Sequence, residues 1–114
     1  MKEIKARALF KIKPGKLVEF KALIAKFIAA VKGNEPGNLQ YRWYLNEEAM
    51  ECVVLEDYVD SDAVLAHAGN VGPLLQESAG LADLSLEVYG NPSEQLLKAI
   101  EGMHIKMYSF HSGI

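Results

Sequence analysis

The sequence predicts one α+β domain built around an antiparallel sheet. Three observations lead to this prediction: strand-like alternation near the start, a long amphipathic helical segment directly after it, and two further strands joined by a short polar turn. At 114 residues the chain is large enough for one hydrophobic core and too short for two. We therefore expect a single domain over residues 1–114.

The first strand and the first helix are clearly marked. Residues 4–12 alternate between apolar and mostly charged side chains, as a half-buried strand does, and Pro14 and Gly15 end the run. Residues 16–32 carry apolar side chains at helical spacing and lead into Gly33. This pattern predicts an amphipathic helix with one buried stripe.

Two strands at residues 39–45 and 50–58 follow, and the polar turn between them predicts an antiparallel hairpin. Residues 52–55 read Cys-Val-Val-Leu and are apolar on both faces. A strand exposed on one side would alternate there, so we expect something to cover both faces of this sheet.

The next segment predicts a helix and a fourth strand. Asp60 is a good N-cap, and the helix that it opens is expected to be interrupted by Gly69 and Asn70 before a second short helical piece at 74–78. Alternation at 84–88 then predicts the fourth strand.

The C-terminal part predicts a short helix and a last strand. The run Asn91-Pro92-Ser93-Glu94 is typical of a capping box, with Asn91 as the cap, and the helix is expected to continue to Gly102. Residues 104–111 are expected to form a fifth strand.

This order of elements is that of a ferredoxin-like split βαβ fold. Its helices pack on one face of the sheet, so the other face needs a separate cover. We expect a homodimer with its sheets face to face and the strand near 105–110 docked on the partner. The core then spans about residues 4–90, and the C-terminal extension about 91–114.

Composition argues against several classes of partner. The net charge is −3 and the charges are interspersed, so no basic face is available for nucleic acid. No apolar run approaches the roughly 20 residues that span a bilayer, and the N-terminal residues lack the apolar core of a signal peptide. The single cysteine, Cys52, has no partner for an intramolecular disulfide. We expect a cytoplasmic protein.

Three segments carry a family resemblance. They are Glu35-Pro36-Gly37-Asn38-Leu39-Gln40-Tyr41 entering the second strand, Val53-Val54-Leu55-Glu56-Asp57-Tyr58 in the third, and Asp60-Ser61-Asp62-Ala63 leading to Ala66-His67. Together they resemble the antibiotic biosynthesis monooxygenases, a family of small dimeric α+β barrels. The resemblance implies a cofactor-independent monooxygenase that oxidises a quinol-like or polyaromatic small molecule with O2, without metal or flavin.

The sequence also departs from that family. Many members carry a tryptophan near the start of the helix after the third strand, where this chain has Val59, and haem-degrading relatives also use an asparagine that the first strand lacks. Haem degradation is therefore disfavoured. Two alternatives stay open: a binding or stress-response module for a small hydrophobic ligand, and an isomerase or hydrolase acting on a small carbonyl or phosphorylated compound.

His67 and Asn70 are the candidate catalytic residues. An imidazole near a helix end is suited to accept a proton around neutral pH, and Asn70 lies close enough in sequence to present an amide to the resulting anion. The alternative for His67 is a structural one, because histidines at helix ends also pack there or interact with the helix C-terminus.

Four further side chains are candidates for substrate binding: Tyr41, Trp43, Glu56 and Tyr58. The aromatic residues are expected to wall a pocket, and the alternative is that they are core residues packed against the first helix. Glu56 shares a strand face with apolar neighbours, where it is either a general base or half of a structural salt bridge with an arginine or lysine.

The sequence predicts no metal site. His104 and His111 are seven residues apart and point to opposite faces of an extended strand, so they do not converge on one ion. Cys52 sits in a β-branched run and is expected to be an inert core residue.

Overall fold

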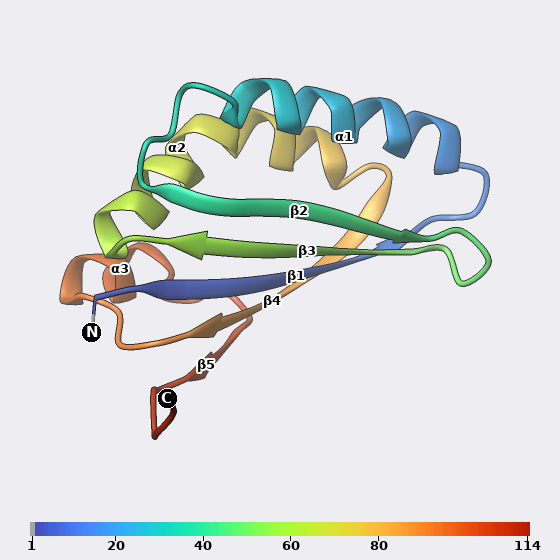
Figure 1. Ribbon diagram of the computed structural model, residues 1–114. Coiled ribbons are helices and arrows are strands. Elements are labelled where there is room, and N and C mark those ends of the chain that lie inside the picture. The colour runs from blue at the N-terminus through green and yellow to red at the C-terminus, as the bar shows by residue number, and fades with distance from the viewer. Residues whose placement is uncertain (1) are drawn as a thin grey trace.

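The computed structural model describes residues 2–114 as a five-stranded sheet with three helices (Figure 1). The predicted α+β class and ferredoxin-like arrangement are confirmed. The elements, in chain order, are β1 (Ile4–Ile12), α1 (Leu17–Val31), β2 (Asn38–Asn46), β3 (Glu51–Tyr58), α2 (Ser61–Ser78), β4 (Ala82–Tyr89), α3 (Glu94–Ala99) and β5 (Ile105–Tyr108).

The strands lie in the order β2-β3-β1-β4-β5. The first four pair antiparallel, with β1 in the centre between β3 and β4. β5 departs from the expected antiparallel pattern because it runs parallel to β4. The reason is the crossover through α3, which returns the chain to the middle of β4, where Ile105 pairs with Leu86.

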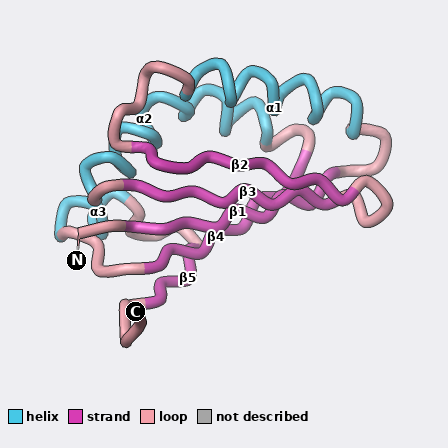
Figure 2. The backbone as a smooth tube through the Cα atoms, in the orientation of Figure 1, coloured by secondary structure: helices cyan, strands magenta, loops and turns pink. Residues whose placement is uncertain are grey.

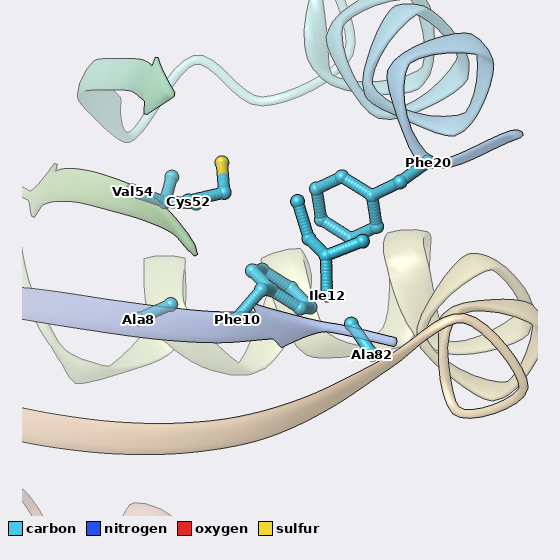
Figure 3. Close-up of a cluster of buried hydrophobic side chains, with 7 residues drawn as sticks. All are labelled: Ala8, Phe10, Ile12, Phe20, Cys52, Val54 and Ala82. Carbon is cyan, nitrogen blue, oxygen red and sulfur yellow. The ribbon is translucent and has the colours of Figure 1, made fainter. Parts of the chain in front are cut away.

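Helices α1 and α2 cover the same face of the sheet, and the opposite face carries no helix (Figure 2). The largest buried cluster fills the space between this covered face and α1 (Figure 3). Phe10 of β1 lies 5.2 Å from Phe20 of α1, measured between ring centroids. Cys52 is fully buried in the same cluster, and this burial raises the pKa of its thiol to about 11. The thiol is therefore protonated at neutral pH, as expected for an inert core residue.

The expected break in α2 is wrong, because the helix continues through Gly69, Asn70 and Pro73. Val71 is fully buried and packs with α1 residues, and Leu75 packs on the same cluster beyond the proline. Tertiary packing on both sides of Pro73 therefore outweighs the local tendency of glycine and proline to end a helix.

The expected start of the third helix is also wrong by two residues. Ser93, not Asn91, is the N-cap: its hydroxyl accepts a hydrogen bond from the backbone nitrogen of Leu96 at 3.1 Å. The Ser93 backbone nitrogen in turn donates to the hydroxyl of Ser61 at 2.9 Å, which joins the start of α3 to the start of α2. The helix ends at Ala99 rather than Gly102, and β5 is shorter than the expected 104–111.

The face of the sheet without helices keeps apolar side chains within reach of solvent. Leu55 is 37% exposed and Tyr44 is 50% exposed. Leu9 pairs with Val53 on the same face, and both are half-buried. β3 is thus apolar on both faces: Cys52 and Val54 point to the helices, and Val53 and Leu55 point to the face without helices. No helix within residues 2–114 has the length and hydropathy needed to cross a membrane.

Replacing Phe20 by Ala should lower the free energy of unfolding by about 3–5 kcal/mol, because it opens a cavity in the buried aromatic cluster. Val18→Ala on the same helix is the control, since Val18 is 81% exposed and should change stability by less than about 0.5 kcal/mol. Urea denaturation measures both. Equal effects of the two substitutions would contradict the assigned orientation of α1.

Candidate active site

A cavity of about 180 Å³ lies between the covered face of the sheet and helices α2 and α3. Almost all of its lining is aliphatic or aromatic, and the polar exceptions are Tyr41, Glu56, Tyr58, His67 and the indole of Trp43. A largely apolar hollow with a few converging polar groups is the usual form of a small-molecule site.

The hollow exists because the central strand carries small side chains beneath α2. Ala6 and Ala8 of β1 line the cavity, whereas Phe10 follows them on the same face and fills the core toward α1. Their neighbours across the sheet are Glu56 and Val54 on β3, and Val88 and Leu86 on β4. Ala6 and Ala8 are consecutive positions on this face of β1, and together they leave space that larger side chains would occupy.

His67 projects from α2 into this cavity and is held by Glu35. The Nδ1 atom of His67 lies 2.8 Å and 3.0 Å from the two carboxylate oxygens of Glu35, whose side chain is only 3% exposed. An Nδ1–H that donates to this carboxylate leaves Nε2 as the nitrogen that faces Glu56 and the cavity. The pair has the geometry of a base oriented by a carboxylate.

A close backbone approach brings Glu35 to His67. The backbone nitrogen of Val59 donates to the carbonyl of Gly37 at 2.9 Å, which ties the loop before β2 to the start of α2. A Cβ atom on Gly37 would lie 2.7 Å from the Cβ of Ala63, so only glycine permits this contact. Asn38 then donates through Nδ2 to Glu35 at 3.1 Å and helps to hold the carboxylate.

Glu56 lies on the other side of the imidazole. Its Oε1 atom is 3.6 Å from Nε2 of His67, and it accepts a hydrogen bond from the hydroxyl of Tyr58. Burial raises the pKa of Glu56, and the nearby Glu35 adds to this effect, although the Tyr58 hydrogen bond and His67 oppose it. Glu56 is thus a buried carboxyl group with a raised pKa beside the imidazole of His67. No arginine or lysine pairs with it within residues 2–114.

Both tyrosines are also poised as neutral hydrogen-bond donors. Burial, with the charge of Glu56 as the next cause, raises the pKa values of Tyr41 and Tyr58 far above neutrality. The rings of Tyr41 and Tyr58 lie 5.2 Å and 5.4 Å from the imidazole of His67, measured between centroids. Both phenols therefore remain protonated near the imidazole.

Trp43 is at once a core residue and part of the cavity wall. Its ring stacks on Phe10 at 5.6 Å and contacts Phe27 at 5.0 Å, and it also lines the cavity. Its indole nitrogen is buried without a hydrogen-bond partner among residues 2–114. The two interpretations offered by the sequence, core and pocket, both apply.

Asn70 does not line the cavity. Its amide nitrogen donates to the carbonyl of Ala30 at 2.9 Å and to Glu35 at 2.8 Å. The structure therefore brings together five of the six predicted site residues and places Asn70 behind Glu35. Sequence reasoning missed Glu35 as a functional residue, because its contact with His67 joins positions 32 residues apart and no local pattern indicates it.

This chain is similar to known proteins in both sequence and structure. The sequence profile of the antibiotic biosynthesis monooxygenase family matches residues 4–72, which is more than half of the chain. The chain belongs to this family. The matched region contains Glu35, Glu56 and His67 but ends before β4.

Solved structures agree with this assignment. MupZ from Pseudomonas fluorescens superposes with a TM-score of 0.88 at 27% identity, over 100% of this chain and 94% of MupZ. A Caulobacter crescentus protein assigned to the antibiotic biosynthesis monooxygenases gives 0.70 at 28% identity, over 76% and 87%. SnoaB from Streptomyces nogalater, a cofactor-independent oxygenase, gives 0.67 at 16% identity, over 82% and 96%, and so shares the fold. A search of curated proteins finds no match.

The structure brings no three histidine, cysteine or acidic side chains of residues 2–114 into a metal-binding group. His104 and His111 lie outside the cavity lining, at the two ends of β5. The absence of a cofactor stays a prediction from the sequence.

Replacing Glu56 by Gln should change how stability depends on pH. Below the ordinary carboxyl pKa of 4.5, the folded and unfolded states both hold the Glu56 proton. As pH rises above that value, the unfolded chain loses the proton before the folded chain does, so the unfolding free energy of the wild type falls relative to that of Glu56→Gln. Urea denaturation at about pH 4 and about pH 8 measures the difference.

Glu48→Gln provides the matched control, because Glu48 is exposed in the turn between β2 and β3. A gap between wild type and Glu56→Gln that stays constant with pH would mean that the pKa of Glu56 is not raised by folding.

Proposed function

We propose that this protein is a cofactor-independent monooxygenase that oxidises a quinol-like or polyaromatic small molecule with O2. The observation that carries the proposal is the Glu35–His67 pair at one end of a largely apolar cavity. Family membership and the likeness to SnoaB, a cofactor-independent oxygenase, support it.

The proposed reaction begins with a proton transfer. Nε2 of His67 takes the proton of a substrate hydroxyl, while Glu35 holds Nδ1 and stabilises the imidazolium that forms. Glu56, whose pKa is raised by burial, and Tyr41, whose phenol stays protonated, lie in the part of the cavity where the negative charge develops, and Tyr58 donates a hydrogen bond to Glu56. Asn70 acts indirectly in this scheme by holding Glu35.

The deprotonated substrate then supplies the electrons itself. One oxygen atom of O2 becomes a carbonyl oxygen on an electron-rich carbon of the substrate anion, and the other leaves as water with the two hydrogens that the substrate loses overall. Because the electrons come from the substrate anion, the protein contributes orientation, a base and a dry cavity. Tyr41 and Trp43 form the aromatic wall against which a flat ring would lie.

A second candidate is a redox-neutral acid–base reaction, such as isomerisation or hydrolysis of a small carbonyl compound. The arrangement that favours it is a carboxyl group with a raised pKa only 3.6 Å from a histidine nitrogen. A proton donor and a proton acceptor then face the same ligand, which is the requirement for moving a proton between two atoms. The third possibility, a binding module without turnover, uses the same cavity.

Replacing His67 by Ala should lower turnover at least about 10²-fold, because it removes the general base. Glu35→Gln should lower kcat by roughly tenfold with little change in KM, since Glu35 orients the base without touching the substrate. His111→Ala is the control, because His111 is exposed and outside the cavity lining. The assay follows O2 uptake and product mass with a panel of quinols and anthrones.

The assay separates the three candidates. O2 uptake that persists unchanged in His67→Ala would remove this residue from the mechanism. Product formation under anaerobic conditions would favour the redox-neutral reaction. Thermal stabilisation by a compound that is never consumed would favour the binding module.

We also propose that two copies pack through the sheet faces that lack helices. Leu9, Val53, Leu55 and Tyr44 supply the apolar surface for this contact. β5 pairs with β4 of its own chain, and the docking of the C-terminal extension on a partner stays a prediction. So does the cytoplasmic location expected from the sequence.

Val53→Lys should convert such a dimer to a monomer at micromolar concentration, because a lysine buried in the interface without a partner costs about 3–5 kcal/mol. Val18→Lys is the control, since Val18 is exposed on α1, on the far side of the molecule from this face. Light scattering measures the mass of both. A wild-type protein that is monomeric at micromolar concentration would rule out this contact.

A further inference from the structure

The cavity is chemically asymmetric from one side of the sheet to the other. Its ionisable groups come from β2, β3 and the part of α2 around His67. The lining contributed by β4, α3 and the segment that leads into β5 is apolar throughout: Leu84, Leu86, Val88, Leu96, Ala99, Ile100, Met103 and Ile105. A ligand therefore meets proton-transfer groups at one end and only hydrocarbon at the other.

The cavity is also long. One row of neighbouring residues crosses all five strands beneath it: Trp43, Val54, Ala8, Leu86 and Ile105. All five line the cavity. With strands roughly 4.8 Å apart, four spacings amount to about 19 Å. A volume of about 180 Å³ above a floor of that length gives an elongated hollow, which we call the channel.

The apolar end reaches the surface at Met103. This side chain is 56% exposed, and Leu84 is 38% exposed although it lies on the face that the helices cover. Met103, Leu86 and Ile105 also line an adjoining surface groove, whose other residues are polar: Ser85, Glu87, His104 and Lys106. The apolar end of the cavity thus lies at the surface beside β4 and β5, next to this groove.

From these observations we infer that the ligand is elongated, with a proton-bearing head beside His67 and Glu56 and an unbranched apolar tail that passes over Ala6 and Ala8 to leave at Met103. The assignment of the head rests on the proposed function, whereas the tail channel rests on the lining alone. Met103 is then a specificity-determining residue that limits how long a tail the channel accepts.

The two ends of the cavity are formed by different parts of the chain. The residues that form the tail end lie in β4, α3, β5 and the segment between α3 and β5, all beyond residues 4–72 that match the family profile. The head groups lie within the matched region. The C-terminal part of this chain therefore selects the tail of the ligand. Residues 4–72, which match the family profile, select its head.

The test uses 4-alkylphenols from 4-methylphenol to 4-decylphenol, with binding to the full chain measured by titration calorimetry. Each added methylene should tighten binding about fourfold while the tail lies in the channel, because burying one CH2 is worth about 0.8 kcal/mol. Affinity that does not change with chain length would overturn the inference.

Met103→Trp should narrow the exit and weaken binding of 4-octylphenol and longer probes at least tenfold, while 4-methylphenol binds as in the wild type. Met107→Trp is the matched control, because Met107 is a partly exposed methionine of β5 that lines neither the cavity nor the groove. Equal binding of the long probes to both variants would place the exit elsewhere, as would an equal loss for short and long probes.

Failure of this inference and failure of the proposed function have different signatures. Calorimetry requires no turnover, so the dependence on tail length stands or falls without any reaction. His67→Ala should retain the fourfold gain per methylene even though it removes the base. Binding that depends on tail length without O2 uptake would support the channel and contradict the monooxygenase. O2 uptake without a dependence on tail length would support the monooxygenase and contradict the channel.

Discussion

The buried carboxylate of Glu35 is the interaction on which the rest of the site depends. A charge in this position, 3% exposed, is tolerated only when donors surround it, and the donors come from Asn38, His67 and Asn70. These donors belong to the entry of β2 and to α2, and Asn70 also bonds to Ala30 near the end of α1. The hydrogen bonds of one buried carboxylate therefore fix the loop before β2, hold α2 against α1 and set the orientation of the imidazole.

In the same region, residues that determine the fold also position the side chains of the site. Gly37 permits the loop to approach Ala63, and this approach delivers Glu35 to His67. Ala6 and Ala8 then leave the sheet unfilled beneath α2, where larger side chains would have added apolar burial. The part of the sheet that faces His67 is therefore less densely packed. The aromatic cluster between the sheet and α1 is dense, and it stabilises the fold in place of the packing that the cavity lacks.

Sequence periodicity was enough to predict most of the fold, because β1, α1 and the β2–β3 hairpin each bury one face and therefore carry a clear pattern. It failed where packing outweighs local preference, as in the uninterrupted α2 across Pro73, and where two good caps compete, as with Asn91 and Ser93. Tyr41, Trp43, Glu56 and Tyr58 could be proposed from their type and strand face, and His67 from its type and its place on a helix. Glu35 could not, and Asn70 was given the wrong neighbour, because both depend on a contact between distant parts of the chain.

The two carboxyl groups beside His67 explain how one imidazole can serve chemistry that needs both an acid and a base. Glu35 accepts hydrogen bonds at both oxygens, whereas Glu56 receives one, from Tyr58, and burial raises its pKa. The carboxyl group with the raised pKa is thus the one that lines the cavity, whereas Glu35 holds Nδ1 of His67 from behind. Because the proton-accepting nitrogen and the proton-donating carboxyl both face the ligand, the side chains alone support either candidate reaction. What distinguishes them is whether the bound anion is electron-rich enough to reduce O2, and that is a property of the head group that the cavity selects.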